Sequence, residues 1–222
     1  MDSFRFDVIA TYAPYLVRGA MWTLWLTILV QAVTLVLAVS AALARLSPRA
    51  WLRMPAVAYI DFFRGTPLLI QLYWVHFGLP VLLGRELPSL VSAVIALSLN
   101  SGAYAAEVVR AGIGSIAKGQ MLAARGLGMS YSQAMRRVIL PQALKRTLPP
   151  MISGFVDILK GTALVSLIGF PDLMYQAGQA NSHSYRSVEI FTAAAFGYFI
   201  IACPLSVLAR HYEKGLLARQ AG

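Results

Sequence analysis

Long stretches without charge alternate with short basic stretches along this 222-residue chain. Four stretches contain no Asp, Glu, Lys or Arg, and a fifth contains only Asp157 and Lys160. A helix that crosses the hydrocarbon core of a bilayer, about 30 Å thick, needs about 20 mostly apolar residues. The pattern therefore predicts five transmembrane helices, within residues 19–44, 65–84, 87–106, 147–171 and 190–209.

The second predicted helix carries charges near its start. We expect it to begin earlier than its charge-free stretch, near Pro55, and so to include Asp61 and Arg64. These two residues stand three positions apart, as do Glu107 and Arg110, so each pair can meet on one helix face. A charge at the centre of a spanning helix costs at least about 2.5–3.5 kcal/mol. The favoured interpretation places both pairs at the cytoplasmic headgroups.

Basic residues gather on one side of the predicted spans. Thirteen follow the first, third and fifth spans, and four precede the first span or follow the second and fourth. Cytoplasmic segments of membrane proteins carry the excess of Lys and Arg. The distribution predicts five spans with the N-terminus outside and the C-terminus in the cytoplasm.

Composition supports a membrane protein and excludes several other classes. Hydrophobic residues make up 58% and charged residues 13%, about half the charge of an average soluble domain. The net charge of +10 lies beside apolar runs, which favours membrane lipid over nucleic acid as the partner. The single cysteine, Cys203, permits no internal disulfide, and we expect no metal site.

The segment from Arg110 to Arg146 is the longest polar stretch, and we place it in the cytoplasm. Its pattern suggests short helices interrupted by Gly119 and Gly128. Small residues at 123 and 124 permit close approach of another surface, Gly128 permits a turn, and Pro141 suits a helix start. An ordinary connecting loop is the alternative interpretation.

This segment resembles the EAA loop of permease subunits of ATP-binding-cassette importers. That pattern is Glu-Ala-Ala, three residues, Gly, nine residues, Ile, one residue and Leu-Pro. The matching residues are Ala123, Ala124, Gly128, Leu140 and Pro141. Val138 replaces the Ile conservatively, whereas Leu122 stands where the family has Glu.

Residues 63–72, 100–107, 148–150 and 159–169 resemble the polar amino acid branch of the same family, of the histidine, glutamine, glutamate and arginine permease type. The resemblance covers about residues 18–215. It implies an all-α membrane protein with the type I importer fold, as one permease domain over residues 1–222. Its coupling loop would occupy about residues 115–141.

The resemblance also implies the partners. These are a second permease subunit, identical or homologous, two ATP-binding subunits, and a periplasmic binding protein that delivers substrate at the bacterial inner membrane. The coupling helix would dock on the ATP-binding subunit, whose closure switches the pathway. The chain contains no Gly-x-x-x-x-Gly-Lys-Ser/Thr loop. We therefore expect a transport permease, not an enzyme, with ATP and magnesium held by the partner.

The fourth span carries the candidate substrate residues. Gly154, Asp157 and Gly161 fall on one helical stripe. The resemblance implies acids at Gly161 and, in some members, at Gly154, so Asp157 is the acid left here. Asp157 could hold a substrate ammonium, with Arg64 and Lys160 as further candidates, or pair only with Lys160. Fewer acids favour an acidic or neutral amino acid over a basic one.

Other function classes make different predictions. A secondary transporter predicts inverted repeats and matching broken helices, and a membrane receptor leaves the EAA spacing unexplained. The sequence shows no internal repeat. Which amino acid is carried, whether an opine replaces it, and whether the permease pairs with itself are left open.

Overall fold

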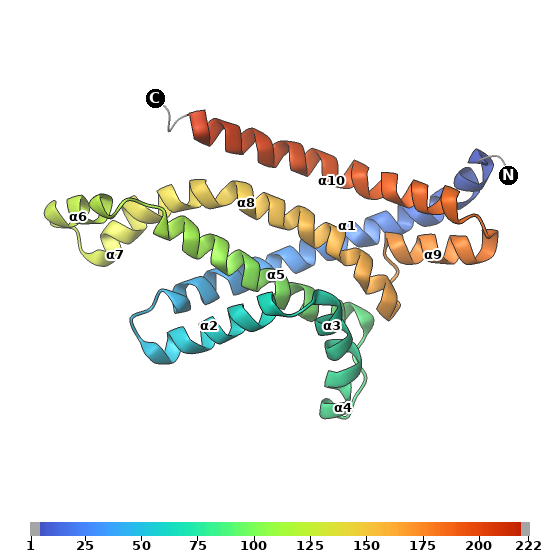
Figure 1. The fold of residues 1–222 in the computed structure, drawn as a ribbon, viewed down its shortest axis with the longest axis horizontal. Helices are drawn as coiled ribbons and strands as arrows, with labels where there is room; N and C mark the ends of the chain where they lie inside the picture. Colours follow the sequence, from blue (N-terminus) through green and yellow to red (C-terminus); the bar gives the residue numbers. More distant parts are fainter. Residues whose placement is uncertain (1–4, 219–222) are drawn as a thin grey trace.

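The computed structural model describes residues 5–218, with side chains as far as Tyr212. Arg219 and the side chain of Lys214, both counted above for orientation, lie outside the described part. The described backbone is helical throughout, apart from short connections (Figure 1). The elements in chain order are α1 (Phe6–Arg45), α2 (Ala50–Gly65), α3 (Leu68–Tyr73), η1 (Trp74–Gly78), α4 (Leu79–Leu83), α5 (Ser89–Gly114), α6 (Lys118–Gly126), α7 (Tyr131–Ala134), η2 (Met135–Ile139), α8 (Leu140–Gly161), η3 (Thr162–Ile168), α9 (Leu173–Ser184) and α10 (Ser187–Ala218).

Four of the five predicted spans are single helical stretches, and the fifth corresponds to a bent pair of helices. Four helical stretches are long and apolar enough to cross a membrane: α1, α5, the run from α7 to η3, and α10. The helices 50–65 and 68–83 pass the same test together, although they bend by 108° at their junction, and as one broken span they make five. Helices dominate because a backbone in lipid must satisfy its own hydrogen bonds.

The helices form an elongated bundle along one axis (Figure 1). α1 packs most extensively against α5, and α8 packs against both α5 and α10. The largest apolar core contains residues from α1, α3, η1, α5, α8 and η3, among them Leu26, Leu72 and Leu97. α6 and α7 form one end of the bundle and α9 the other, whereas α3 and α4 turn away from its side (Figure 1).

Two π-helical turns precede prolines within otherwise continuous helices. η1 ends two residues before Pro80, and η2 ends two residues before Pro141. A proline inside a helix lacks an N–H and clashes with the carbonyl four residues earlier. A π turn displaces that carbonyl. Pro141 is therefore the second residue of α8, as its suitability for a helix start predicted, and it directly follows the bulge in a helical run that began at Tyr131.

The connection between the fourth and fifth spans is itself helical, because it contains α9, which Asp172 caps. Two local expectations were wrong. Gly119 lies inside the first turn of α6 and interrupts nothing. Asp61 lies 3.9 Å from Arg45 of α1 instead of pairing with Arg64, because α1 and α2 pack side by side.

Candidate functional site

The turn between α6 and α7 is built from local hydrogen bonds. The N–H of Met129 donates to the carbonyl of Ala124 at 3.2 Å, and the N–H of Gly128 donates to that of Arg125 at 3.0 Å. This pair of hydrogen bonds ends α6 in a Schellman motif, which needs a residue in the left-handed backbone conformation. Gly128 supplies it with φ of +82°. The predicted glycine turn is confirmed.

The next helix begins at once, through a capping box. The hydroxyl of Ser130 accepts from the N–H of Gln133 at 3.3 Å, and the Gln133 side chain accepts from the N–H of Ser130 at 2.9 Å. Two helix ends therefore meet within a few residues, each satisfied by its own neighbours. The backbone bonds that cap both helix ends at this turn are therefore local.

The predicted coupling residues lie on two sides of this end of the bundle. Ala124 is buried, whereas Ala123 and Gly128 are exposed. Leu140 and Pro141 follow η2 at the start of α8, beside a small apolar core that joins α5, α6, η2 and α8. Arg146 reinforces that junction, because it donates to the carbonyl of Ser115 at 2.6 Å.

Apolar side chains project from the same end. Leu122 is 70% exposed and Leu127 81% exposed, and Tyr131 is also exposed. Exposed apolar residues on a polar segment are typical of a surface that another protein covers. Sequence reasoning treated Leu122 as a departure from the family pattern and passed over Leu127 and Tyr131. The available signal for this surface was the presence of large apolar residues between basic ones in the same segment.

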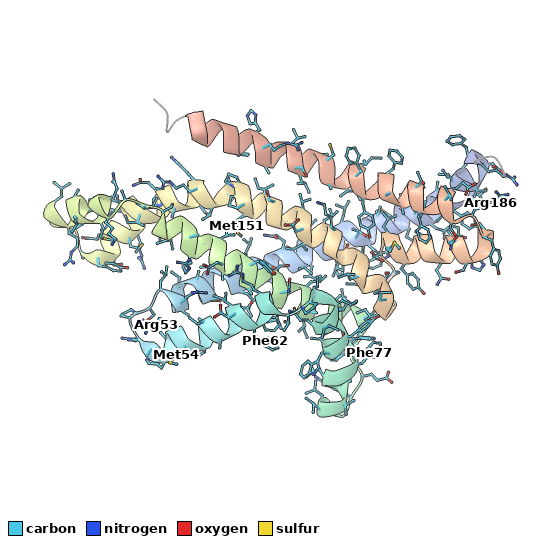
Figure 2. The ribbon with its side chains drawn as sticks, viewed as in Figure 1. Arg53, Met54, Phe62, Phe77, Met151 and Arg186 are labelled. Carbon is cyan, nitrogen blue, oxygen red and sulfur yellow. The ribbon has the colours of Figure 1, made fainter. Side chains whose placement is uncertain are left out.

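A cavity of about 840 Å³ opens among α1, α2, α3, α5 and α8. Arg64, Gly154, Asp157 and Gly161, all predicted substrate residues, line it. Met151, labelled in Figure 2, lies on the α8 wall. A Cβ at Gly154 would meet nothing within 4 Å, so this glycine opens space as expected. The remaining lining is Gln31, Thr34, Leu68, Leu97, Asn100, Ser101, Tyr104, Ala105, Glu107, Val108, Ala111, Pro149, Pro150, Ser153 and Ile158.

Lys160 is the predicted pathway residue that the cavity does not include. Successive residues of an α-helix are about 100° apart, so the step from Gly161 to Lys160 leaves the lining face. Lys160 is exposed, and within the described part of the chain it forms no ion pair with Asp157. Asp157 faces the cavity and has no charged partner among those residues.

Of the other charges of the cavity wall, Glu107 is engaged in ion pairs and Arg64 contacts an aromatic ring. Glu107 contacts Arg110 on α5, with an Nε–Oε1 distance of 2.9 Å, and Arg45 on α1 at 3.1 Å. The predicted spacing of Glu107 and Arg110 does form a pair. The guanidinium of Arg64 lies over the ring of Tyr104, 5.4 Å from its centroid. Cation–π contact of this kind holds a guanidinium while leaving its N–H donors available.

The outer end contains a buried carboxylate. Asp172 is fully buried, and its oxygens accept from the N–H of Tyr175 and the hydroxyl of Tyr198, both at 2.9 Å. Burial raises the pKa of Asp172, which lies between the fourth and fifth spans, to about 6. The next residue donates its N–H to the Thr23 hydroxyl at 3.1 Å. A Cβ at Gly19 would lie 2.8 Å from the Asp172 carbonyl, so α9 and α1 approach closely.

Comparison with known proteins agrees with this architecture. Residues 34–217 match the family described as "Binding-protein-dependent transport system inner membrane component". The arginine transport system permease protein ArtQ of Bacillus subtilis is 36% identical over 214 residues, which cover 95% of this chain and 96% of that protein. The glutamine transport system permease protein GlnP of Escherichia coli is 35% identical, with 95% and 97% covered.

Solved structures show the same fold. A crystal structure of an amino acid ABC transporter with histidines matches with a TM-score of 0.91 and 38% identity, covering 96% of this chain and 99% of that one. A chain of the MetNI methionine ABC transporter matches with a TM-score of 0.70 at 22% identity, which is a likeness of fold. The chain therefore belongs to the binding-protein-dependent transport system inner membrane components, the permease subunits of ATP-driven importers that work with ATPase and binding-protein partners.

Proposed function

We propose that this permease carries a polar amino acid with a neutral side chain, and that the cavity among α1, α2, α3, α5 and α8 is a station on the pathway. One observation carries the proposal. Asp157 and Arg64 line one cavity, and neither is taken up by an ion pair within the described residues. An amino acid brings one ammonium and one carboxylate, which complement one free acid and one guanidinium.

The charge balance supports a neutral side chain over a basic one. Glu107, the other acid of the lining, is neutralised by Arg45 and Arg110. An additional cationic group on the substrate would find no further unpaired acid among the lining residues. The relatives named for arginine and glutamine transport support an amino acid as substrate and leave this distinction to experiment.

We further propose that α6 and the turn at Gly128 form the coupling element. The exposed Leu122, Leu127 and Tyr131 give this end a surface for an ATP-binding subunit, which would hold ATP and magnesium. The complex would contain two permease subunits and two ATP-binding subunits. The basic distribution supports placing α6 in the cytoplasm of a bacterium, with the N-terminus outside the inner membrane.

The test is uptake by the complex reconstituted in liposomes with its ATPase and binding protein. Asp157→Asn keeps the size of the side chain and removes its charge. Because a hydrogen bond to a charged group contributes about 1.5–3 kcal/mol, we expect uptake of neutral amino acids to fall by about tenfold or more, with assembly unchanged. Normal uptake of every amino acid by this variant would remove Asp157 from the pathway.

Lys160→Gln is the matched control. It removes a charge from the same helix three residues away, outside the cavity lining. We expect uptake close to that of the unaltered complex. An equal loss in both variants would instead indicate that charge on α8 matters for assembly. Preferential uptake of lysine or arginine by the unaltered complex would contradict the proposed neutral substrate.

A further inference from the structure

The break between α2 and α3 leaves backbone carbonyls without helical partners. A helix ends with four such carbonyls, and for α2, which ends at Gly65, these belong to residues 62–65. Lipid offers them no donor, so broken helices in membranes depend on side chains or water. The residues from 62 to 66 therefore require donors from elsewhere in the chain.

Side chains provide donors for most of these carbonyls. The Thr66 hydroxyl donates to the carbonyl of Phe62 at 2.8 Å, and the Tyr104 hydroxyl donates to that of Arg64 at 3.4 Å. The amide of Gln71 donates to the carbonyls of Phe63 and Thr66, both at 3.0 Å. Figure 2 labels Phe62 beside the break.

Gln71 is the centre of this network. Its side chain is 6% exposed, and its Oε1 accepts from the Asn100 amide of α5 at 3.1 Å. Asn100 also donates to the carbonyl of Phe63 at 3.1 Å. One side chain of α3 thus connects the end of α2 to α5. Loss of its N–H groups would leave the Thr66 carbonyl without this amide donor.

The same break sets the position of Arg64. Arg64 lies in the last turn of α2, one residue from the helix end, and lines the cavity with Asn100 and Tyr104. Its backbone carbonyl and its guanidinium both contact Tyr104. A change in the direction of α2 at the break would move the guanidinium relative to Asp157 of α8, which lines the same cavity.

We infer that Gln71 is a positioning residue, which fixes the break between α2 and α3 and so holds Arg64 at the cavity wall. Gln71 itself is absent from the cavity lining. It acts through the carbonyls at the end of α2 and through Asn100. The effect of Gln71 on transport rests on the proposed function, whereas its effect on the geometry of the break does not.

The break is tested by a distance measurement in the assembled complex. Spin labels at Met54→Cys on α2 and Val81→Cys on α4 occupy exposed positions on either side of it, in a Cys203→Ser background. Labelled chains are diluted with unlabelled ones, so that one copy in each complex reports. Gln71→Met keeps the length of the side chain and removes both donors, and we expect a broader and shifted distance distribution.

Two further variants make the measurement specific. Gln71→Glu, protonated in this buried site, keeps one donor, so we expect an intermediate distance distribution. This variant replaces Gln71→Met in the test if Gln71→Met fails to assemble. Tyr59→Phe removes another hydrogen bond from α2 to α5, the 2.7 Å bond to the Leu99 carbonyl, away from the break. We expect Tyr59→Phe to leave the distribution unchanged. Unchanged distributions in both Gln71 variants would overturn the inference.

The role through Arg64 is tested by uptake. Gln71→Met should raise KM by roughly fivefold or more, as expected when a buried polar group loses its partner. In an Arg64→Ala background the same change should add little, because residues that act through one another are not additive. Full additivity would reject the link to Arg64. If the unaltered complex imports no amino acid, the proposed function fails, and the distances still decide whether Gln71 fixes the break.

Discussion

The turn at Gly128 and the break after Gly65 both interrupt helices, but they satisfy their backbone in different ways. In the turn, each cap bond joins residues that lie within five positions of one another. In the break, two of the donors come from α5, and Asn100 is 37 residues away from its acceptor at Phe63. The first interruption depends on local bonds alone, whereas the second also depends on tertiary contacts through the buried side chain of Gln71.

The difference follows from the solvent. Water can replace a missing donor at the exposed turn, so local capping is enough there. Where lipid covers a helix break, an unsatisfied carbonyl costs several kcal/mol, so we expect the break to depend on Gln71, Asn100 and Tyr104 together. We expect variants of the turn to act locally and variants of the break to act cooperatively.

The largest effect should come from Gly128→Val in the turn. A β-branched residue is poorly tolerated at φ of +82°, although its side chain would meet no neighbour within 4 Å. Transport should be abolished while the chain still assembles in the membrane. Gly128→Asn, which tolerates this conformation, should retain most transport. Wild-type transport by the valine variant would show that the turn does not couple.

The next effect distinguishes cooperative from local behaviour. The side chains of Gln71 and Asn100 both donate to the carbonyl of Phe63 and contact one another, so the losses of unfolding free energy in Gln71→Met and Asn100→Ala should differ from additivity by about 0.5–3 kcal/mol. Gln71→Met combined with Ser130→Ala should be additive within about 0.5 kcal/mol. Thermal unfolding in detergent, followed by tryptophan fluorescence, measures both cycles. Coupling of equal size in the two cycles would contradict the comparison.

Ser130→Ala alone should have a smaller effect. It removes the hydroxyl half of the capping box at the start of α7. The cost of losing such a cap is about 1 kcal/mol. Hydrogen exchange should accelerate in residues 130–134 and remain unchanged around the break at 65–67. Faster exchange in both regions would show that the turn is not independent of the bundle.

The same distinction explains what the sequence could predict. Charge-free stretches of about 20 residues predicted the spans, and the glycine spacing predicted the turn, because both depend on neighbouring residues. The bend of 108° was missed, since Gly65 and Pro67 show only that a helix end is possible. The Asp61–Arg64 spacing predicted the wrong ion pair, because the partner of Asp61 is Arg45, which lies on another helix.

Part of the candidate site was predictable in the same sense. The stripe of Gly154, Asp157 and Gly161 follows from helical spacing, and the structure places all three on the cavity. The roles of Gln71 and Asn100 depend on contacts between α3, α5 and the end of α2. Polar residues inside charge-free spans were the available signal, and spacing alone could not pair them.

The smallest expected effect concerns the start of α9. There a carboxylate, Asp172, bonds the backbone at a helix end, whereas neutral amides do so at the break. Burial raises the pKa of Asp172 from its ordinary value of 3.8 to about 6. The folded protein therefore binds this proton more tightly than the unfolded chain, so the free energy of unfolding should rise by a few tenths of a kcal/mol as the pH falls from 7 to 6. Asp172→Asn should remove this contribution, whereas Gln71→Met should leave it unchanged. Thermal unfolding of the three proteins at both pH values measures the difference, and the same pH response in the asparagine variant would place the titrating group elsewhere.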